Sequence, residues 1–205
     1  MSMNNKYPIH SIGRLRMGTD GEGIRTLVFL SGCPLRCKYC FNPATWDGSK
    51  EPKMMTAEEV YSKIRIDRPY ILATNGGITF GGGEPLSYPD LINEMRSICE
   101  PEMTIYAETS LNVPWENIEK TAEAINKYYV DIKATDPEIY KAYTGGTLDI
   151  VLDNLVKLIQ RKDADSVVVR IPEIEGFVDA EKQEESREML YEMGVRRFNL
   201  FKYKV

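Results

Sequence analysis

Ser166-Val-Val-Val-Arg-Ile171 contains three consecutive valines with no polar residue between them. Such a run predicts a strand buried on both faces, as in a parallel sheet covered by helices. Five other apolar runs have the length of strands, and segments with helical periodicity separate them. Alternating strands and helices are typical of an α/β fold with parallel strands. The five other runs are Thr26–Ser31, Ile78–Phe80, Met103–Glu108, Tyr128–Lys133 and Arg197–Phe201.

Helix signals fill most of the intervals between these runs. Thr56 followed by Glu59 forms a capping box, and apolar stripes predict helices over 88–99, 148–159 and about 180–193. Six β/α units fit into 205 residues, whereas a closed eight-unit barrel needs about 250. The sequence therefore predicts a partial (β/α)6 TIM-like barrel with parallel strands, open on one side. We expect a single domain over residues 1–205, with 1–20 as an N-terminal segment.

Composition excludes several classes of function. The net charge is -5 and the charges are spread along the chain, so no nucleic-acid partner is expected, because such a partner needs a basic face. No apolar run approaches the length of a membrane span. Residues 1–10 lack the apolar core of a signal peptide, which predicts a cytoplasmic protein with reduced thiols. The single histidine, His10, excludes a multi-histidine metal site and is expected near a mobile chain end.

Polar and glycine residues follow the predicted strands at their carboxyl ends. Parallel sheets place active sites at this edge, because the strand ends meet there. We therefore expect five consecutive strand ends to converge on one site. In chain order they carry the cysteines of segment 33–40, Gly81-Gly82-Gly83-Glu84-Pro85, Glu108-Thr109-Ser110, Asp131 with Lys133, and Arg170.

Segment 33–40 is the predicted cluster-binding loop and reads Cys33-Pro-Leu-Arg-Cys37-Lys-Tyr-Cys40, a C-x3-C-x2-C spacing. Three thiolates on one loop can hold three irons of a [4Fe–4S] cubane and leave the fourth iron open to a substrate, whereas electron-transfer clusters use four cysteines. The alternative is a zinc site of these cysteines and His10, although zinc motifs usually come as two separated pairs. Cys99 is expected at the far end of a helix, as a small core residue.

This spacing, with an aromatic residue before the third cysteine, resembles the radical S-adenosylmethionine (SAM) superfamily. Two flanking stretches are similar, more specifically, to the glycyl radical enzyme activating enzymes of the pyruvate formate-lyase activating type. They are Asp20-Gly21-x-Gly23-x-Arg25 before the cysteines and Asn42-Pro43-x-Thr45-Trp46 after them. The later motifs follow in the family's order, so the resemblance covers almost the whole chain. It implies one [4Fe–4S] cluster on Cys33, Cys37 and Cys40, with SAM as a second cofactor.

The resemblance also implies roles for residues at the strand ends. Gly82, Gly83 and Glu84 match the glycine-rich motif that receives the amino end of SAM, and Lys133 matches the lysine that pairs with the SAM carboxylate. Glycines let carbonyl groups approach an ammonium closely, and a glutamate adds charge. The alternative for the glycine motif is an ordinary strand-to-helix turn.

A monovalent-cation site beside the SAM carboxylate is the next implication, with Glu108, Thr109 and Asp131 as its residues. The matching family segment usually reads Asp-Thr-Asn, whereas this chain reads Glu108-Thr109-Ser110. The longer side chain and the lost amide change the geometry of such a site. A salt bridge between Lys133 and Glu108 is the alternative arrangement.

Asp20 and Arg170 match residues that hold the backbone of the substrate or, for Arg170, the SAM carboxylate; structural ion pairs are the alternative. The implied chemistry is reductive cleavage of SAM, with an electron from a flavodoxin or ferredoxin-type donor. The resulting 5′-deoxyadenosyl radical takes a hydrogen atom from a glycine of a partner glycyl radical enzyme. Two other functions stay open on the sequence: a radical SAM enzyme for a small molecule or peptide, and a non-catalytic iron–sulfur or zinc protein.

Overall fold

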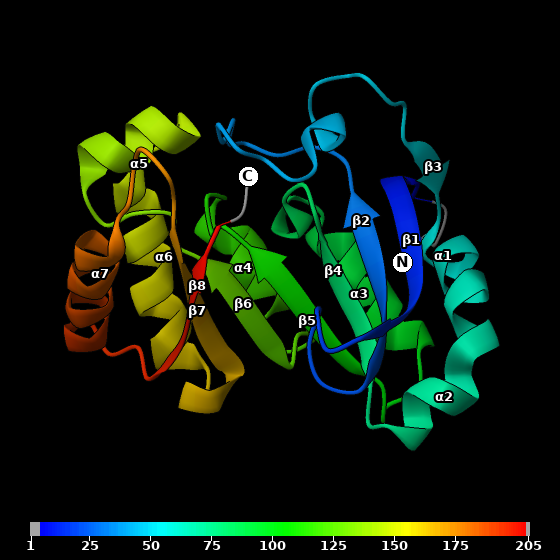
Figure 1. Ribbon diagram of the computed structural model, residues 1–205. Helices are drawn as coiled ribbons and strands as arrows, with labels where there is room; N and C mark the ends of the chain where they lie inside the picture. The colour runs from blue at the N-terminus through cyan, green and yellow to red at the C-terminus, as the bar shows by residue number, and fades with distance from the viewer. Residues whose placement is uncertain (1–4, 204–205) are drawn as a thin grey trace. The chain divides into compact units, whose positions relative to one another are not determined.

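The computed structural model describes residues 5–203, and its helices and strands are labelled in Figure 1. The chain forms two compact units. Unit 1 holds residues up to Cys33, Asn42–Glu108 and Glu116–Asn126, and unit 2 holds Pro34–Phe41, Thr109–Trp115 and residues from Lys127 onward. Within 5–203, no helix is both long enough and apolar enough to cross a bilayer.

Unit 1 has five strands in the order β3-β1-β2-β4-β5. Strand β1 pairs antiparallel with β2 and β3, whereas β2, β4 and β5 run parallel. The strands are β1 (Tyr7–Met17), β2 (Ile24–Leu30), β3 (Lys53–Met55), β4 (Gly77–Gly82) and β5 (Thr104–Thr109). The helices are η1 (Pro43–Thr45), α1 (Ala57–Ile64), η2 (Arg65–Asp67), α2 (Arg68–Ala73), η3 (Pro85–Ser87), α3 (Pro89–Ile98) and α4 (Trp115–Thr121).

Apolar side chains of β2 and β4 form the centre of the unit 1 core. Val28 lies opposite Phe80 in the parallel register, and neither side chain is exposed. Burial of a side chain of this size contributes roughly 1.5–3 kcal/mol. The predicted capping box of α1 is present: the Thr56 hydroxyl accepts from the Glu59 amide at 3.2 Å, and the Glu59 carboxylate accepts from the Thr56 amide at 2.8 Å.

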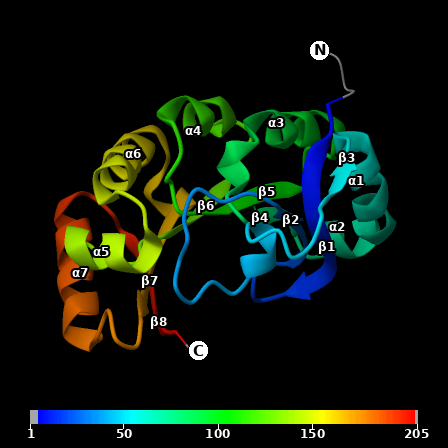
Figure 2. The ribbon, with the colours of Figure 1, turned by 90° about the horizontal axis from the view of Figure 1, so that it is seen from above.

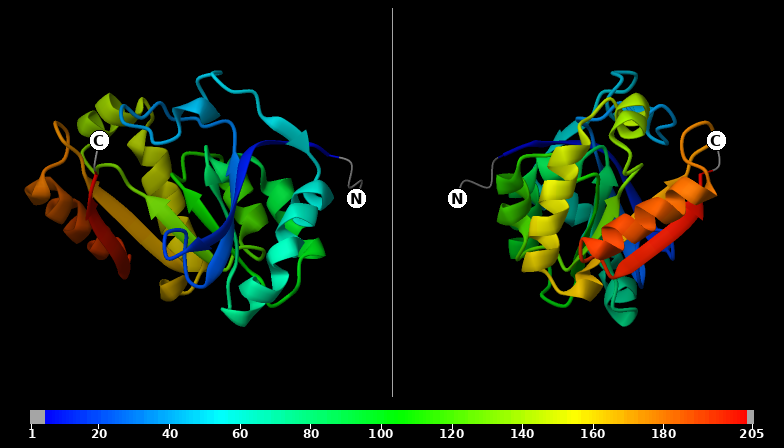
Figure 3. Two further views of the ribbon diagram at one scale, coloured as in Figure 1. Left: turned by 45° about the vertical axis from the view of Figure 1, so that its right-hand side comes forward. Right: turned by 90° about the vertical axis from the view of Figure 1, so that its left-hand side faces the viewer.

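Unit 2 has three parallel strands in the order β6-β7-β8. Gln183 ties α7 to this sheet, because its side-chain amide donates to the carbonyls of Ile171 at 2.7 Å and Phe201 at 3.1 Å; Figure 3 shows α7 running beside β8. The elements are β6 (Lys127–Asp131), α5 (Pro137–Thr144), α6 (Leu148–Arg161), η4 (Ala164–Ser166), β7 (Val167–Glu173), α7 (Ala180–Glu192) and β8 (Arg197–Lys202).

The six predicted strands are confirmed as β2, β4, β5, β6, β7 and β8, and so is the α/β class with parallel strands. The sheet is open as predicted, since β3 and β8 each have one neighbouring strand. Within β7, Val167 and Val169 are buried and Val168 is half-buried. Strands β1 and β3 were not predicted from the sequence. His10 was wrongly expected near a mobile end; it lies inside β1, which pairs on both sides.

Candidate functional site

The loop that carries Cys37 and Cys40 is attached to the C-terminal end of α5. The backbone amide of Arg36 donates to the carbonyl of Thr144 at 2.8 Å, and that of Lys38 donates to the carbonyl of Tyr143 at 3.0 Å. The last carbonyls of a helix have no partner inside the helix. The loop amides therefore satisfy α5, and α5 in turn fixes the loop. Figure 2 shows the chain after β2 passing close to α5.

Two glycines after α5 allow this close approach. Gly145 caps the helix in the left-handed conformation, with φ of 71°. A Cβ atom at Gly146 would lie 2.4 Å from Cδ2 of Leu35, a buried side chain of the cysteine loop. A larger residue at position 146 would displace the buried Leu35 side chain.

An aromatic cluster holds the loop from a second direction. The Tyr39 ring makes edge contacts with Tyr143 at 6.0 Å and Phe177 at 6.1 Å between centroids, and Tyr143 contacts Phe177 at 5.1 Å. The Tyr203 hydroxyl donates to the backbone carbonyl of Tyr39 at 2.7 Å. Edge-to-face contacts contribute about 0.5–1.5 kcal/mol each beyond burial. The residue before Cys40 is therefore a packing anchor.

The cysteines of the loop differ from Cys99 in burial. Cys33, Cys37 and Cys40 are free thiols and half-buried, whereas Cys99 is buried. Burial raises the pKa of the Cys37 thiol, Cys40 and Asp131 raise it further, and Lys133 opposes the shift. Among residues 5–203, no three His, Cys, Asp or Glu side chains are placed to hold a single metal ion.

An iron–sulfur cubane and a mononuclear zinc ion make different demands on three cysteines. A zinc ion draws its ligands onto one tetrahedral centre. A cubane instead takes each thiolate on a different iron, so its ligands need not share one centre. The zinc alternative of three cysteines with His10 would need all four side chains on one such centre.

Asp131, Arg170 and Lys133 form a charged group at the carboxyl ends of β6 and β7. Asp131 lies opposite Arg170 in the parallel register. Its Oδ1 accepts from Arg170 Nε at 2.7 Å, and its Oδ2 lies 3.2 Å from Lys133 Nζ. Burial pushes the pKa of Asp131 upward, but the two cations outweigh this effect and lower it to about 2. Lys133 is thus ion-paired with Asp131.

The glycine-rich turn after β4 lies against the residue that precedes Cys33. The amide of Gly83 donates to the Leu30 carbonyl, and the amide of Glu84 donates to the Gly32 carbonyl, both at 2.8 Å. A Cβ atom at Gly83 would lie 2.1 Å from the Gly32 carbonyl oxygen, and Gly82 has φ of 94°. Glu84 is buried, and its carboxylate accepts from the Leu86 amide at 3.2 Å. These glycines therefore bring the turn onto the start of the cysteine loop.

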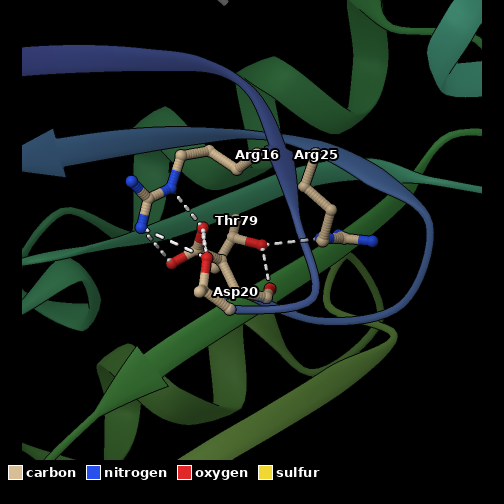
Figure 4. A network of polar contacts seen from close by, with 5 residues as sticks. Arg16, Asp20, Arg25 and Thr79 are labelled. Carbon is tan, nitrogen blue, oxygen red and sulfur yellow. Dashed lines mark hydrogen bonds and ion pairs between the residues drawn. The ribbon is translucent and has the colours of Figure 1, made fainter.

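Asp20 belongs to a buried polar network, drawn in Figure 4. Arg16 Nε donates to its carboxylate at 2.6 Å, while the Thr79 hydroxyl donates to its backbone carbonyl at 2.7 Å. Arg25 is fully buried, donates to the Thr79 hydroxyl at 2.7 Å, and lies 3.6 Å from the centre of the Tyr106 ring. The network joins the hairpin between β1 and β2 to β4 and β5.

Glu108 and Thr109 end β5, as predicted. Glu108 lies beside the β4 backbone: a Cβ atom at Gly81 would be 3.1 Å from its Oε2. The hydrogen bond to Asp20 raises the pKa of Arg16, burial opposes this shift, and the charges of Asp20 and Glu108 raise the pKa further. The buried Thr109 hydroxyl accepts from the Leu111 amide at 2.9 Å.

The sequence analysis missed the platform for the cysteine loop. No motif in the sequence pointed to Tyr143, Phe177 or Tyr203. The pair Gly145-Gly146 after a short amphipathic segment was the available signal, since a glycine pair there allows a helix cap and a close approach.

Comparison with known proteins gives related sequences along most of the chain. A family model, described as the radical SAM superfamily, matches residues 27–187. The pyruvate formate-lyase-activating enzyme of Clostridium pasteurianum is 39% identical over 139 residues, which cover 67% of this chain and 57% of that protein. The 4-hydroxyphenylacetate decarboxylase activating enzyme of Clostridioides difficile (strain 630) is 30% identical over 227 residues, or 80% of this chain and 71% of that protein. The aligned part of this chain thus spans less than two thirds of the C. pasteurianum relative.

Solved structures show the same fold at low sequence identity. SuiB of Streptococcus suis, bound to S-adenosylmethionine, aligns with a TM-score of 0.67 at 16% identity, over 84% of this chain and 39% of that chain. TYW1 with a lysine-pyruvate adduct aligns with a TM-score of 0.61 at 22% identity, over 88% of this chain and 65% of that chain. The matched span from residue 27 to 187 contains all three loop cysteines, and the named relatives are activating enzymes. The chain belongs to the radical SAM superfamily, in the branch of the glycyl radical enzyme activating enzymes.

Proposed function

We propose that this protein is a radical SAM activating enzyme that abstracts a hydrogen atom from a glycine of a partner glycyl radical enzyme. The observation that carries the proposal is the likeness to activating enzymes over 80% of the chain. When bound, the [4Fe–4S] cluster and SAM supply reductive cleavage of a sulfonium, which makes a radical able to abstract hydrogen from carbon. The protein positions the reactants and keeps water and other reactive groups away from the radical.

Cys33, Cys37 and Cys40 would hold the cluster, because thiolates are the ligands that iron–sulfur clusters prefer. Lys133 would pair with the SAM carboxylate. Its present partner Asp131 is also paired with Arg170, so Asp131 keeps a cationic partner if Lys133 turns to SAM.

The glycine-rich turn would receive the amino end of SAM through its backbone. Gly82 and Gly83 present carbonyls without side chains, and ammonium groups pair well with such carbonyls. The buried carboxylate of Glu84 supports the turn by accepting from Leu86. We propose that Glu84 acts both on the turn and on the SAM ammonium.

Asp20 and Arg170 would orient the backbone of the partner's glycine loop. Each is ion-paired in this structure, Asp20 with Arg16 and Arg170 with Asp131. Each would therefore keep an oriented charge while it offers a second hydrogen-bonding position to an incoming amide.

A monovalent cation on Glu108, Thr109 and Asp131 is part of the same proposal. Both carboxylate oxygens of Asp131 already face a cationic side chain, so a bound cation would displace one of these pairs. SAM affinity measured in potassium, sodium and a large organic cation tests the site, and equal affinity in all three contradicts it.

The test of the proposed function combines two measurements on one sample. Reconstituted protein, SAM and dithionite should give 5′-deoxyadenosine, measured by chromatography. Addition of a glycyl radical enzyme from the same genome should give a glycine-centred EPR doublet. Product without a doublet from any such enzyme, together with turnover of a small molecule or peptide, contradicts the activase proposal.

Asp20→Asn separates substrate positioning from cofactor chemistry. The variant should keep the cluster and uncoupled SAM cleavage within about twofold but install at least tenfold less radical, since one charge-assisted hydrogen bond is worth about 1.5–3 kcal/mol. Asp165→Asn is the control, because Asp165 is an exposed ion-paired aspartate in unit 2. Equal loss of both signals in Asp20→Asn would assign Asp20 to the fold or to SAM.

A further inference from the structure

A buried tyrosine of α5 packs against the turn between Cys37 and Cys40. The two residues between these cysteines both contact Tyr143. The Lys38 amide donates to the Tyr143 carbonyl at 3.0 Å, and the Tyr39 ring meets the Tyr143 ring edge-on, with 6.0 Å between centroids. Tyr143 is 1% exposed, and all of these residues belong to unit 2. The segment with two of the three loop cysteines therefore lies directly against Tyr143.

The hydroxyl of Tyr143 is buried and makes no hydrogen bond within the part of the chain that the structure describes. A neighbouring hydroxyl, that of Tyr203, donates instead to the carbonyl of Tyr39 at 2.7 Å. Native proteins rarely bury a donor without a partner, because the group loses its hydrogen bonds to water and gains none in return. The proton of the Tyr143 hydroxyl is thus available to an acceptor that binds beside it.

Negative charge on the loop cysteines reaches this hydroxyl. Burial raises the pKa of Tyr143, and the charges of Cys37 and Cys40 raise it further, while the backbone of Tyr39 and the side chain of Tyr203 oppose the shift. A tyrosine hydroxyl is protonated at neutral pH and can donate one hydrogen bond. Tyr143 thus combines a proton that no described residue accepts with sulfur atoms close enough to act on it.

We propose that the Tyr143 hydroxyl donates a hydrogen bond to a sulfur of the cluster on Cys37 and Cys40, and that this bond raises the reduction potential of the cluster. The inference rests on the proposed function, because the cluster supplies the acceptor. Sulfur carries more negative charge when the cluster is reduced, so a donor stabilises the reduced state more than the oxidised state. Hydrogen bonds to sulfur are among the factors that set iron–sulfur potentials. One electron enters from an added reductant, and the hydroxyl keeps its proton throughout.

The packing of the Tyr143 ring can be separated from its hydroxyl. The edge contact with Phe177, 5.1 Å between centroids, and the hydrogen bond from Lys38 do not involve the hydroxyl. Tyr143→Phe therefore removes one proton donor and keeps the contacts that support the cysteine loop. The cluster-free variant should melt at the same temperature as the wild type or higher, because it loses no hydrogen bond and no longer buries an unpartnered group.

A potentiometric titration of the reconstituted protein without SAM, followed by EPR of the reduced cluster, measures the effect of the hydroxyl. Tyr143→Phe should lower the reduction potential by about 30–60 mV, which corresponds to a roughly three- to tenfold smaller equilibrium constant for one-electron reduction. Incorporation of 3-fluorotyrosine at position 143 should raise the potential, because the fluorinated hydroxyl is a stronger donor. Deuterium ENDOR in heavy water should detect a coupled deuteron in the wild type that is absent from Tyr143→Phe.

Two further variants control for the loss of a hydroxyl as such. Tyr61→Phe removes a tyrosine hydroxyl that already donates to Glu100 in unit 1. Thr26→Val removes a buried hydroxyl that also has no hydrogen-bond partner among residues 5–203, near the start of β2, whereas Cys33 follows the end of that strand. Neither variant should change the reduction potential.

Three results would overturn the hydrogen bond. An unchanged potential in Tyr143→Phe with an intact cluster shows that the hydroxyl donates to no sulfur, and it leaves the proposed function untouched. A lower melting temperature of the cluster-free variant assigns the hydroxyl to the fold. If Tyr143→Phe holds no cluster, an unchanged potential with 3-fluorotyrosine contradicts the bond.

The same samples separate this inference from the proposed function. Shifted potentials in a protein that activates no glycyl radical enzyme support the hydrogen bond and contradict the activase. A wild-type protein that assembles no cluster refutes both.

Discussion

At the scale of single residues, the expected cofactor contacts are already engaged with one another. Asp131 joins Arg170 and Lys133 at the ends of two neighbouring strands. Three charges that satisfy each other can be partly buried, because an unpaired buried charge costs several kcal/mol. Asp131, Arg170 and Lys133 thus compensate one another's charge.

Cysteine substitution tests the cluster. Cys33→Ala, Cys37→Ala and Cys40→Ala should each lower the iron content well below about four per chain and abolish SAM cleavage, because a cubane needs all three thiolates. Iron analysis and visible absorbance after anaerobic reconstitution measure the result. Cys99→Ala is the matched control, since Cys99 is a buried free thiol. Full iron content in any loop variant contradicts the assignment.

Lys133→Met tests SAM anchoring. Asp131 keeps Arg170 as its partner at 2.7 Å, so the fold and the cluster should persist while SAM binds roughly 10- to 100-fold more weakly, as expected for one lost charge-assisted contact. Calorimetric titration with SAM gives the Kd. Lys157→Met removes an exposed ion pair on α6 and should leave the Kd unchanged. An unchanged Kd in Lys133→Met means that the pocket lies elsewhere.

At the scale of helices and strands, short elements with polar interiors were the hardest to predict. The six parallel strands are apolar runs whose side chains fill a covered sheet, and burial alone determines such strands. In β1, by contrast, Pro8, Gly13 and two register shifts interrupt the alternation. The eight residues of α5 bury Tyr140, Tyr143 and Thr144 in place of an aliphatic stripe.

The residues of the site at strand ends could be predicted from the sequence, whereas the contacts that hold the cysteine loop could not. Strand ends carry Asp131 and Arg170 in register, so their neighbourhood follows from parallel pairing. The attachment of Arg36 to Thr144 and the fit of Gly146 against Leu35 depend on tertiary packing. The spacing of apolar residues in the sequence does not indicate such contacts between distant segments.

Gly146→Ala tests the platform under the cysteine loop. The added methyl would lie 2.4 Å from Leu35 Cδ2, so this buried side chain must shift, and overpacking of this kind costs about 1–3 kcal/mol. We expect a lower melting temperature and faster loss of the cluster to a chelator, followed by visible absorbance. Gly13→Ala is the control, because its methyl would have no neighbour closer than 3.5 Å. Identical chelation rates in both variants contradict the platform.

At the scale of the whole molecule, the stability of the protein in acid depends in part on one ion pair. Arg14 donates to both oxygens of Asp67 at 2.6 and 2.7 Å, which joins β1 to η2. The hydrogen bond from Arg14 holds the pKa of Asp67 below its usual value. A depressed folded pKa stabilises the protein above the unfolded value of about 3.9 and loses this effect as the pH falls through the folded value.

Arg14→Met should therefore lower the melting temperature at pH 7 by roughly 2–6 °C. The difference from the wild type should narrow below about pH 4, because protonated Asp67 no longer gains from the arginine. Calorimetry between pH 2.5 and pH 7 measures both curves. Lys157→Met, which breaks an exposed pair on α6, should show neither effect. If the difference in melting temperature stays constant with pH, the lower stability of Arg14→Met comes from lost packing of the Arg14 side chain.

The attachment of the cysteine loop to α5 also has a consequence for biosynthesis. The loop amide of Arg36 and its acceptor Thr144 lie about a hundred residues apart along the chain. A ribosome adds about 5–20 residues per second, so the thiols leave it roughly 5 to 20 s before their support exists. Iron delivered during that interval meets a loop without its scaffold. We therefore expect the loop to be ready for cluster insertion only after α5 has been made and has folded.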